Sequence, residues 1–429
     1  MIKHLKPQSL QEWLAWIETL HPREIELGLA RVQAIQARLN LTRPDFCIIS
    51  VAGTNGKGST VAMLEAMVHA AGYRVGAYTS PHLLNYNERV RVGAQMVTEA
   101  DLCAAFSRVE AARKDIPLTY FEFGTLAAVD IFRRARVDTA ILEVGLGGRL
   151  DAVNAWDADV SIVASIGIDH TEWLGPDRES IGREKAGVFR AHHPAICSDP
   201  EPPASIAGAA AAIGADLLQL GRDFSWERQG PGWSWRGKWR DQERSRTGLP
   251  YPAMRGDYQL FNAAGALMAL ETLRERFPVS QAHIRAGLLN AVLPGRFQTL
   301  PGAPLRVLDV AHNAEAAYQL AATLRAQTVL GRTLAVAGML KDKPLVDVMR
   351  VMSSVVDEWY VAGLPTPRTA SSEQLLAALA AAGNQAPATA HTDIATAYAA
   401  ACGRAEDTDR IIVFGSFYTV GAILRLLND

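Results

Sequence analysis

The chain has 429 residues, of which 49% are hydrophobic and 21% are charged, and its formal net charge is -2. This length predicts two or three domains with sizeable cores, and the composition is that of a soluble globular protein. The near-neutral charge gives no reason to expect nucleic acid or an anionic membrane as a partner. The four cysteines are far apart and form no CxxC pair, which argues against a disulfide framework or a cysteine metal site.

The N-terminus and the hydropathy of the chain bear on its location. Residues 1–7 lack the apolar core of a secretory signal, and no run approaches the ~20 apolar residues that a membrane span needs. We therefore expect a cytoplasmic protein with no membrane partner, and we expect it to be a monomer.

The first half of the chain alternates between helix-like and strand-like runs. Residues 10–39 predict an amphipathic helix, because apolar side chains such as Trp13, Ile17 and Val32 recur at helical spacing. Runs at 46–52, 74–79, 138–144 and 160–166 are almost continuously apolar, which is typical of parallel strands covered on both faces. A helix is expected at 61–67. This alternation predicts a P-loop-type α/β domain with a mostly parallel sheet and helices on both faces.

Residues 222–250 differ, since four tryptophans lie there among Arg, Lys, Gly and Pro. Trp233, Trp235 and Trp239 share one parity, so a strand would place them on one face. Aromatic side chains among basic residues can bind single-stranded nucleic acid. The alternative, which we favour, is a small antiparallel sheet that packs on the domain through its tryptophans.

After a helix expected at 257–277, the strand–helix alternation resumes. Strands are expected at 305–309, 334–337 and 411–416, with a helix at 314–325 and another at the C-terminus. We therefore expect residues 1–293 to form the larger domain and residues 294–429 to form a smaller, Rossmann-like α/β domain.

A glycine-rich segment joins the first predicted strand to the helix that follows it. It reads Gly53, Thr54, Asn55, Gly56, Lys57, Gly58, Ser59, Thr60. Such a loop turns backbone N–H groups toward phosphate, and the helix N-terminus adds partial positive charge. Lys57 would reach the outer phosphates, and Ser59 or Thr60 could offer a hydroxyl to Mg²⁺. Two residues rather than four separate the first two glycines, so a turn that binds nothing is the alternative.

Polar side chains follow three further predicted strands. Ser80 follows the second strand, Glu143 ends the third, and His170 follows the fourth. Ligands of parallel sheets bind beyond the carboxyl ends of the strands, so these side chains could hold a metal–phosphate site. Mg²⁺ usually prefers oxygen to histidine nitrogen. The alternatives are a turn serine before Pro81, an ion pair between Glu143 and Arg149, and a loop histidine without a ligand role.

Several motifs occur together in an order that resembles the folylpolyglutamate synthase/dihydrofolate synthase family of Mur-type amide ligases. They lie at 50–59, 79–83, 143–151, 169–170, 182–187, 262–263, 294–298 and 309–313, nearly from end to end of the chain. The phosphate loop of that family has this same Gly-Lys-Gly-Ser form. Ala314 stands where the family usually has proline, at a helix start, and we expect this departure to have little effect.

The resemblance implies roles that the residues alone do not establish. It implies that Ser80, Glu143 and His170 hold Mg²⁺, and that Lys185 is carbamylated and holds a second metal. Lys57, Glu143, His170 and Lys185 would form the catalytic set. It also implies that four residues from beyond the first motifs reach ATP across a domain cleft, namely Asn262, Arg296, Asp309 and His312. The alternative for Asp309 and His312 is a strand end that caps the next helix.

Three segments resemble the pteridine-binding segments of the bifunctional bacterial members. They are Gly28, Leu29, Ala30, Arg31; then Thr119, Tyr120, Phe121, Glu122; and then Leu150, Asp151, Ala152. Phe121 and Phe123 share a parity, so both could face the core. An aromatic platform for the pterin is the alternative.

The resemblance therefore implies an ATP-dependent ligase that adds L-glutamate to 7,8-dihydropteroate and to tetrahydrofolate through an acyl phosphate. Its partners would be these small molecules, with ATP as co-substrate and two Mg²⁺ ions. The alternatives are a folylpolyglutamate synthase only, a Mur ligase that acts on a peptidoglycan precursor, and a non-catalytic ATP-binding module. The pteridine-like segments argue against the peptidoglycan alternative.

Overall fold

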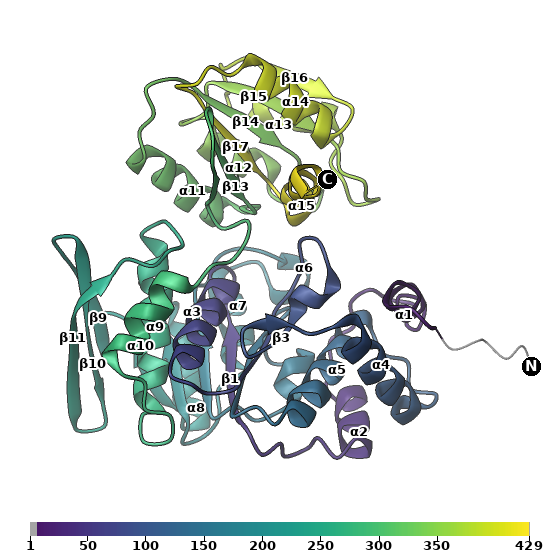
Figure 1. Ribbon diagram of the computed structural model, residues 1–429, viewed down its shortest axis with the longest axis vertical. Coiled ribbons are helices and arrows are strands. Elements are labelled where there is room, and N and C mark those ends of the chain that lie inside the picture. Colours follow the sequence, from purple (N-terminus) through teal and green to yellow (C-terminus); the bar gives the residue numbers. More distant parts are fainter. Residues whose placement is uncertain (1–6, 429) are drawn as a thin grey trace, which may run out of the picture. The chain divides into compact units, whose positions relative to one another are not determined.

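The computed structural model describes residues 7–428 (Figure 1). The prediction that the chain lacks a secretory signal concerns residues 1–7. Of these, residues 1–6 lie outside the described residues. The contacts within the chain divide it into two compact units. The first unit holds residues up to 166, 170–251 and 261–291, and the second holds 167–169, 252–260 and 292–429.

The first unit is built on an eight-stranded sheet with the order β4-β3-β2-β5-β1-β6-β7-β8. Six strands are parallel: β1 Cys47–Ala52, β2 Val75–Tyr78, β5 Thr139–Glu143, β6 Val160–Val163, β7 Pro194–Cys197 and β8 Asp216–Gln219. Two short antiparallel strands, β3 Val90–Val92 and β4 Gln95–Met96, extend one edge. Every residue of β1 and β5 is buried, as their continuous apolar character predicted.

Helices cover both faces of this sheet, so the predicted fold class is confirmed (Figure 1). They are α3 Lys57–Ala70, α4 Glu99–Arg113, α5 Tyr120–Ala135, α6 Thr171–Leu174, α7 Arg178–Ala186, α8 Ala204–Ile213, α9 Tyr258–Thr272 and α10 Gln281–Asn290. Helix α10 crosses α3 closely, since a Cβ at Gly287 would lie 2.4 Å from the Met67 side chain. Two 3₁₀ turns, η1 Tyr86–Arg89 and η2 Ala152–Ala155, complete the unit.

The prediction of one helix across residues 10–39 is wrong. The structure has two helices, α1 Leu10–Ile17 and α2 Ala30–Arg38, with an irregular connection between them. Pro22 in this connection lacks a backbone N–H, and Gly28 adopts a φ of 155°, which a helix does not allow. The apolar periodicity continues through the break because both helices face the same core.

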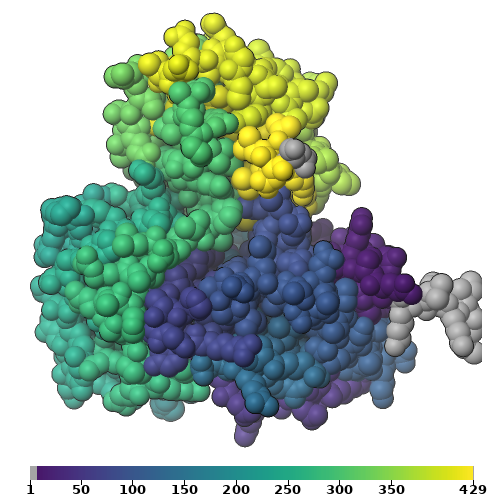
Figure 2. Space-filling view, viewed as in Figure 1, coloured from purple at the N-terminus to yellow at the C-terminus, as the bar shows by residue number. Residues whose placement is uncertain are grey.

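The Trp-rich segment forms a three-stranded antiparallel sheet, as predicted. Its strands are β9 Phe224–Gln229, β10 Gly232–Trp239 and β11 Gln242–Pro250, and it lies beside α10 (Figure 1, Figure 2). The indoles of Trp233 and Trp235 are buried, and Nε1 of Trp235 donates to the carbonyl of Ala264 in α9 at 3.2 Å. These two indoles therefore hold the insert on the first unit and do not offer a surface on which bases could stack.

The second unit contains a six-stranded sheet with the order β12-β13-β17-β14-β15-β16. The parallel strands are β13 Leu305–Asp309, β14 Thr333–Ala337, β15 Glu358–Ala362, β16 Ala388–His391 and β17 Arg410–Phe414, and β12 Gln298–Leu300 is antiparallel. The helices are α11 Ala314–Ala326, α12 Leu345–Met352, α13 Ser372–Ala381, α14 Ile394–Arg404 and α15 Phe417–Asn428. Its own core includes Trp359 and Phe414, which makes it a separate Rossmann-like α/β unit. In the part of the chain that the structure describes, no helix is both long and apolar enough to cross a membrane.

Candidate functional site

The strand order of the first unit brings four of the predicted site segments to neighbouring strand ends. In the order β2-β5-β1-β6, Ser80 follows β2, Glu143 ends β5, the glycine-rich segment follows β1, and His170 comes after β6. All four strands are parallel, so these segments all begin at the carboxyl ends of the strands, on the same side of the sheet. Adjacent strands are about 4.8 Å apart, and this spacing suits a ligand the size of a triphosphate.

The glycine-rich segment is anchored at both of its turns. Gly56 precedes α3 with a φ of 82°, and Gly53 has a φ of 149°, values that side-chain-bearing residues rarely adopt. The backbone N–H of Thr54 donates to the Ser165 carbonyl at 2.6 Å, which ties the loop to the segment that follows β6. A Cβ at Gly56 would lie 2.4 Å from Oδ1 of Asn262, so this residue, which was predicted to bind the nucleotide, lies directly against the loop. Asn262 belongs to the first unit, so the expectation that it reaches across a domain cleft is wrong.

Two side chains of the loop donate hydrogen bonds to the backbone of the loop. The ammonium of Lys57 donates to the carbonyls of Gly53 at 3.1 Å and Thr54 at 3.2 Å, so it lies over the turn where phosphates are expected. The hydroxyl of Thr60 donates to the Gly56 carbonyl at 2.9 Å and is buried in the first turn of α3. Thr60 therefore stabilises the helix start, and Ser59 is the better candidate for a metal-facing hydroxyl.

Ser80 and Glu143 lie side by side. The backbone N–H of Ser80 donates to Oε2 of Glu143 at 3.1 Å, and the Glu143 carboxylate is buried. The alternative of an ion pair between Glu143 and Arg149 is wrong, because the Arg149 guanidinium pairs with Glu184 at 2.9 Å. His170 is half-buried with a left-handed φ of 52° and precedes α6.

These residues fit a magnesium ion. Within residues 7–428, no three side chains of His, Cys, Asp and Glu converge in a metal-binding cluster. A cation beside Glu143 would therefore complete its coordination with the Ser80 hydroxyl, water and substrate phosphate oxygens, which is how Mg²⁺ is commonly held. The adjacent carboxylate and hydroxyl supply the oxygen donors that this ion prefers.

Lys185 is buried in α7, which is unusual for a lysine. The loop 145–151 packs on the same helix. The N–H of Arg149 donates to the Glu184 carbonyl at 2.9 Å, and a Cβ at Gly148 would lie 2.9 Å from the Lys185 carbonyl oxygen. Helix α7 and the loop 145–151, which follows Glu143 in the sequence, are thus fixed to each other.

The three segments predicted to bind the pteridine come together in space. The N–H of Gly28 donates to the Leu150 carbonyl at 3.1 Å. Nε of Arg31, in α2, donates to the buried carboxylate of Glu122, in α5, at 3.1 Å. Leu29 and Ala30 lie at the start of α2, Thr119 caps α5, and Ala152 begins η2. Segments that are far apart in the sequence therefore form one neighbourhood.

The parity argument for Phe121 and Phe123 is wrong, because both lie in helix α5, where residues two apart point to different faces. Phe123 is in the core, with its ring 5.5 Å from that of Phe106. Phe121 is half-buried, with its ring 5.8 Å from that of Tyr78. Tyr120 lies under the guanidinium of Arg89 at 5.5 Å. Phe121 and Tyr120 therefore remain candidates for an aromatic platform, and Phe123 does not.

Asp151 is a buried carboxylate at the start of η2. It accepts hydrogen bonds from the N–H of Leu146 at 2.8 Å and of Val153 at 3.0 Å. Burial raises the pKa of Asp151 to about 6, against the opposing effects of these backbone donors and of the Lys57 charge. The Asp151 carboxylate thus links the two ends of the loop between β5 and η2 through hydrogen bonds to their backbone.

The predicted residues of the second unit gather at the carboxyl end of β13. Oδ2 of Asp309 accepts from the N–H of Phe297 and Oδ1 from that of Ala311, both at 2.8 Å. Burial raises the pKa of Asp309, and the nearby Arg296 guanidinium opposes the shift. Asp309 does not cap α11, because Asn313 does so by accepting from the N–H of Ala316.

His312 and Arg296 have side chains with defined partners in the same unit. Nδ1 of His312 lies 2.8 Å from the Val310 carbonyl, so Nδ1 carries the proton. Nε2 of His312 is 3.6 Å from Oδ2 of Asp169, which belongs to the second unit. The Arg296 guanidinium lies over the Phe417 ring at 5.2 Å. Ala314, where proline was expected, begins α11 without disturbing it.

Two further charged residues were not predicted. Arg91, in β3, pairs with the buried Glu65 of α3 at 2.7 Å and donates to the hydroxyl of Thr79 at 3.2 Å, one residue before Ser80. Lys343 pairs with Asp169 at 2.7 Å. Neither Arg91 nor Lys343 lies in a glycine-rich or strand-end motif, so no local signal identifies them.

Comparison with known proteins agrees with this architecture. Residues 295–417 match the family model described as Mur ligase, glutamate ligase domain. With the phosphate loop of the first unit, this defines a Mur-type ATP-dependent ligase. A dihydrofolate synthase/folylpolyglutamate synthase from Escherichia coli is 46% identical over 431 residues, which cover 100% of this chain and 98% of the relative.

Two solved structures are similar over nearly the whole chain. E. coli FolC in complex with DHPP and ADP has a TM-score of 0.93 at 45% identity, and the match covers 99% of this chain and 98% of that one. A bifunctional folylpolyglutamate synthase/dihydrofolate synthase with Mn, AMPPNP and L-glutamate bound has a TM-score of 0.91 at 47% identity, with 99% and 100% coverage. The chain therefore belongs to the dihydrofolate synthase/folylpolyglutamate synthase family.

Proposed function

We propose that this chain adds L-glutamate to 7,8-dihydropteroate and to tetrahydrofolate, each time with cleavage of ATP. The observation that carries the proposal is the row of strand ends in the first unit, where the glycine loop lies between Glu143 and His170. The convergence of the three pteridine-like segments supports the acceptor class. The relatives bear the names of both activities, which supports the bifunctional assignment over folylpolyglutamate synthase alone and over a peptidoglycan ligase.

The chain uses ATP and a divalent cation, since similar structures hold ADP, or AMPPNP with Mn. We propose that Mg²⁺ is the ion, that Ser80, Glu143 and His170 hold one ion, and that carbamylated Lys185 holds a second. Carbamylation replaces the ammonium of the buried Lys185 by an anion, and a bound cation would offset the cost of burying that anion. The ions would neutralise the charge of the phosphate groups.

In the first half of the reaction, the acceptor's carboxylate (that of dihydropteroate, or the γ-carboxylate of the terminal glutamate of tetrahydrofolate) attacks the γ-phosphate, the bond from that phosphorus to the bridging oxygen breaks, and ADP leaves. Phosphoryl transfer depends on positioning and charge neutralisation. The amides of the loop 53–60 would orient the phosphates, and the Lys57 ammonium would exchange its carbonyl partners for phosphate oxygens. The product is an acyl phosphate.

In the second half, the neutral amine of L-glutamate attacks the acyl carbon, and phosphate leaves from a tetrahedral intermediate. We assign residues 1–293 to nucleotide and pterin binding and residues 294–429 to the closing of the site over ATP and glutamate, although 167–169 and 252–260 group with the second unit. In the second unit, the contact between His312 Nδ1 and the Val310 carbonyl orients the imidazole so that Nε2 faces the Asp169 carboxylate.

A phosphate-release assay tests the proposal. We expect release that requires both L-glutamate and either dihydropteroate or tetrahydrofolate. Lys57→Ala should lower turnover by orders of magnitude, whereas Lys238→Ala, an exposed lysine of β10, should leave it unchanged. A folded Lys57→Ala protein with normal turnover, or release that ignores the pteroate acceptor, would show that the assignment is wrong.

A further inference from the structure

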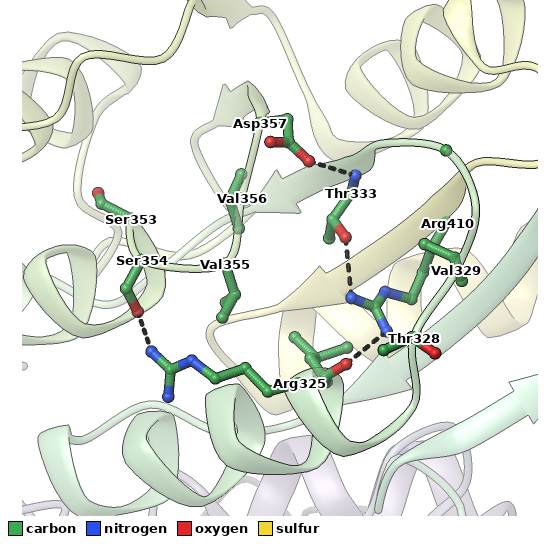
Figure 3. A pocket seen from close by; sticks show the side chains of 12 residues that line it. Arg325, Thr328, Val329, Thr333, Ser353, Ser354, Val355, Val356, Asp357 and Arg410 are labelled. Atoms are coloured by element: carbon green, nitrogen blue, oxygen red, sulfur yellow. Dashed lines mark hydrogen bonds between the residues drawn. The ribbon is translucent and has the colours of Figure 1, made fainter.

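The second unit contains a hollow of about 350 Å³ that the proposed reaction does not use (Figure 3). Arg410 is the first residue of β17, Thr333 is the first of β14, and Asp357 directly precedes β15, so the hollow lies at the amino ends of these parallel strands. Asp309 lies at the opposite, carboxyl ends of the strands, as the last residue of β13. It pairs with Phe414, four residues or ~13 Å along β17 from Arg410.

Arg410 carries a buried positive charge whose hydrogen-bond partners are all neutral. The residue is 4% exposed. Nη1 donates to the carbonyls of Leu324 at 2.9 Å and Gln327 at 2.6 Å, and Nη2 donates to the Thr333 hydroxyl at 2.8 Å. Within residues 7–428, no acidic side chain accepts a hydrogen bond from this guanidinium.

Two donors among the described residues that line the hollow lack a partner. Nε of Arg410 is buried with no hydrogen-bond acceptor, and the buried hydroxyl of Ser353 has none either. Two partly buried arginines of the first unit, Arg31 and Arg91, lie against glutamates, whereas the buried Arg89 donates through Nε to Nδ1 of His82. Burial lowers the pKa of Arg410, and the more distant charge of Asp357 opposes this shift without cancelling it.

The rest of the lining adds further donors and little negative charge. Arg325 extends along the hollow to Ser354, as Figure 3 shows, and is exposed to solvent. The Thr333 hydroxyl accepts from Arg410 and keeps its own proton to donate. Among the described lining residues Asp357 is the one acid, and its Oδ2 already accepts the N–H of Thr333 at 2.7 Å. Two guanidinium groups against one carboxylate leave the lining with a net positive charge.

We propose that this hollow binds a small oxyanion of the phosphate class, either free inorganic phosphate or the phosphate group of a monoester. Phosphate oxygens would accept from Arg410, Arg325 and the Ser353 hydroxyl, and guanidinium groups are the preferred protein partners of phosphate. A purely structural role of Arg410, as a cap of the last carbonyls of α11, accounts for Nη1. It does not account for the unpartnered Nε and Ser353 hydroxyl.

The test is calorimetric titration of the full-length protein with inorganic phosphate. It is run in the Lys57→Ala background, so that binding at the glycine loop does not mask the second site. Arg325→Gln removes one guanidinium from the rim, where folding does not depend on it. Arg350→Gln is the matched control, because Arg350 is an exposed arginine of α12 outside the hollow. Ser353→Ala tests the unpartnered hydroxyl, and glycerol 3-phosphate serves as the monoester.

We expect the Lys57→Ala protein to bind phosphate at one site. Adding Arg325→Gln should weaken the affinity for phosphate about tenfold, and adding Arg350→Gln should change that affinity by no more than about twofold. Ser353→Ala should weaken it severalfold. Competition by glycerol 3-phosphate would identify a phosphomonoester site, and binding of inorganic phosphate alone would identify a site for the free ion. Equal affinities of the Arg325→Gln and Arg350→Gln proteins, or no phosphate binding in the Lys57→Ala background, would overturn the proposal. Neither result would touch the proposed ligase activity.

Discussion

The ion pair between Arg91 and Glu65 offers a test of how the sheet edge and the phosphate-loop helix are held together. The Arg91 side chain is 15% exposed and that of Glu65 is 7% exposed, and their atoms meet at 2.7 Å. Replacing Arg91 by methionine would leave the Glu65 carboxylate buried without its partner. Breaking a buried pair in this way costs about 3–5 kcal/mol, and the residual exposure of Arg91 favours a value of about 3 kcal/mol.

The double replacement should behave differently. In Arg91→Met/Glu65→Met no charge remains to be desolvated, and methionine packs well in irregular gaps, so we expect a loss of only about 1 kcal/mol. The two single variants and the double variant form a double-mutant cycle, measured by urea unfolding followed by tryptophan fluorescence. The expected coupling energy is about 2 kcal/mol or more.

The Mg²⁺ dependence of activity distinguishes the effect of Arg91 on stability from its effect on the position of Ser80. Arg91 also donates to Thr79, which directly precedes Ser80. Both the Arg91→Met variant and the double variant lose this bond, so both should show an apparent KM for Mg²⁺ that is raised severalfold, although only the single variant is strongly destabilised. Two results would refute this reasoning. One is a loss of stability in the double variant equal to the sum of the losses in the two single variants. The other is a KM for Mg²⁺ that is raised only in the strongly destabilised Arg91→Met variant.

Three further predictions concern the first unit. Gly56→Ala should destabilise the loop by about 1–3 kcal/mol and weaken ATP binding, seen as a raised KM for ATP, because its φ is 82° and its Cβ would meet Asn262; a normal KM would contradict this. The pKa of Asp151 is raised in the folded protein from the ordinary aspartate value of 3.8 to about 6, so folding favours the protonated acid and stability should fall by about 1 kcal/mol as pH rises from 5 to 7. Urea unfolding at both pH values should show this fall in the parent protein and not in Asp151→Asn. Lys185→Ala should abolish turnover while leaving the protein folded, and an intact mass showing unmodified Lys185 in active protein would contradict the carbamylation proposal.

Much of the fold could be predicted because its signals are local. The central strands that were predicted, such as β1, β5 and β14, are short and almost continuously apolar runs, and the helix α3 begins within the glycine-rich segment, at Lys57. The insert was predicted from the parity of its tryptophans, and the burial of Trp233 and Trp235 confirms that prediction.

The failures concern relations between segments. Apolar periodicity alone could not reveal the break between α1 and α2, because both helices face one core. The parity of Phe121 and Phe123 misled because it assumed a strand where Thr119 caps a helix. The pairing of Arg91 with Glu65 depends on the register of β3 against β2, and the partners of Arg410 depend on the packing of α11. No pattern within a few residues encodes such register or packing.

The position of β1 between β5 and β6 has a consequence for how the protein matures. The strand that carries the glycine loop is made early, yet both of its neighbours follow much later in the chain, at Thr139–Glu143 and Val160–Val163. A growing chain that has released only β1 and α3 therefore cannot assemble a nucleotide pocket. Acquisition of ATP affinity should coincide with insertion of β1 between its later partners, and nucleotide would then stabilise the whole central sheet against unfolding instead of one loop.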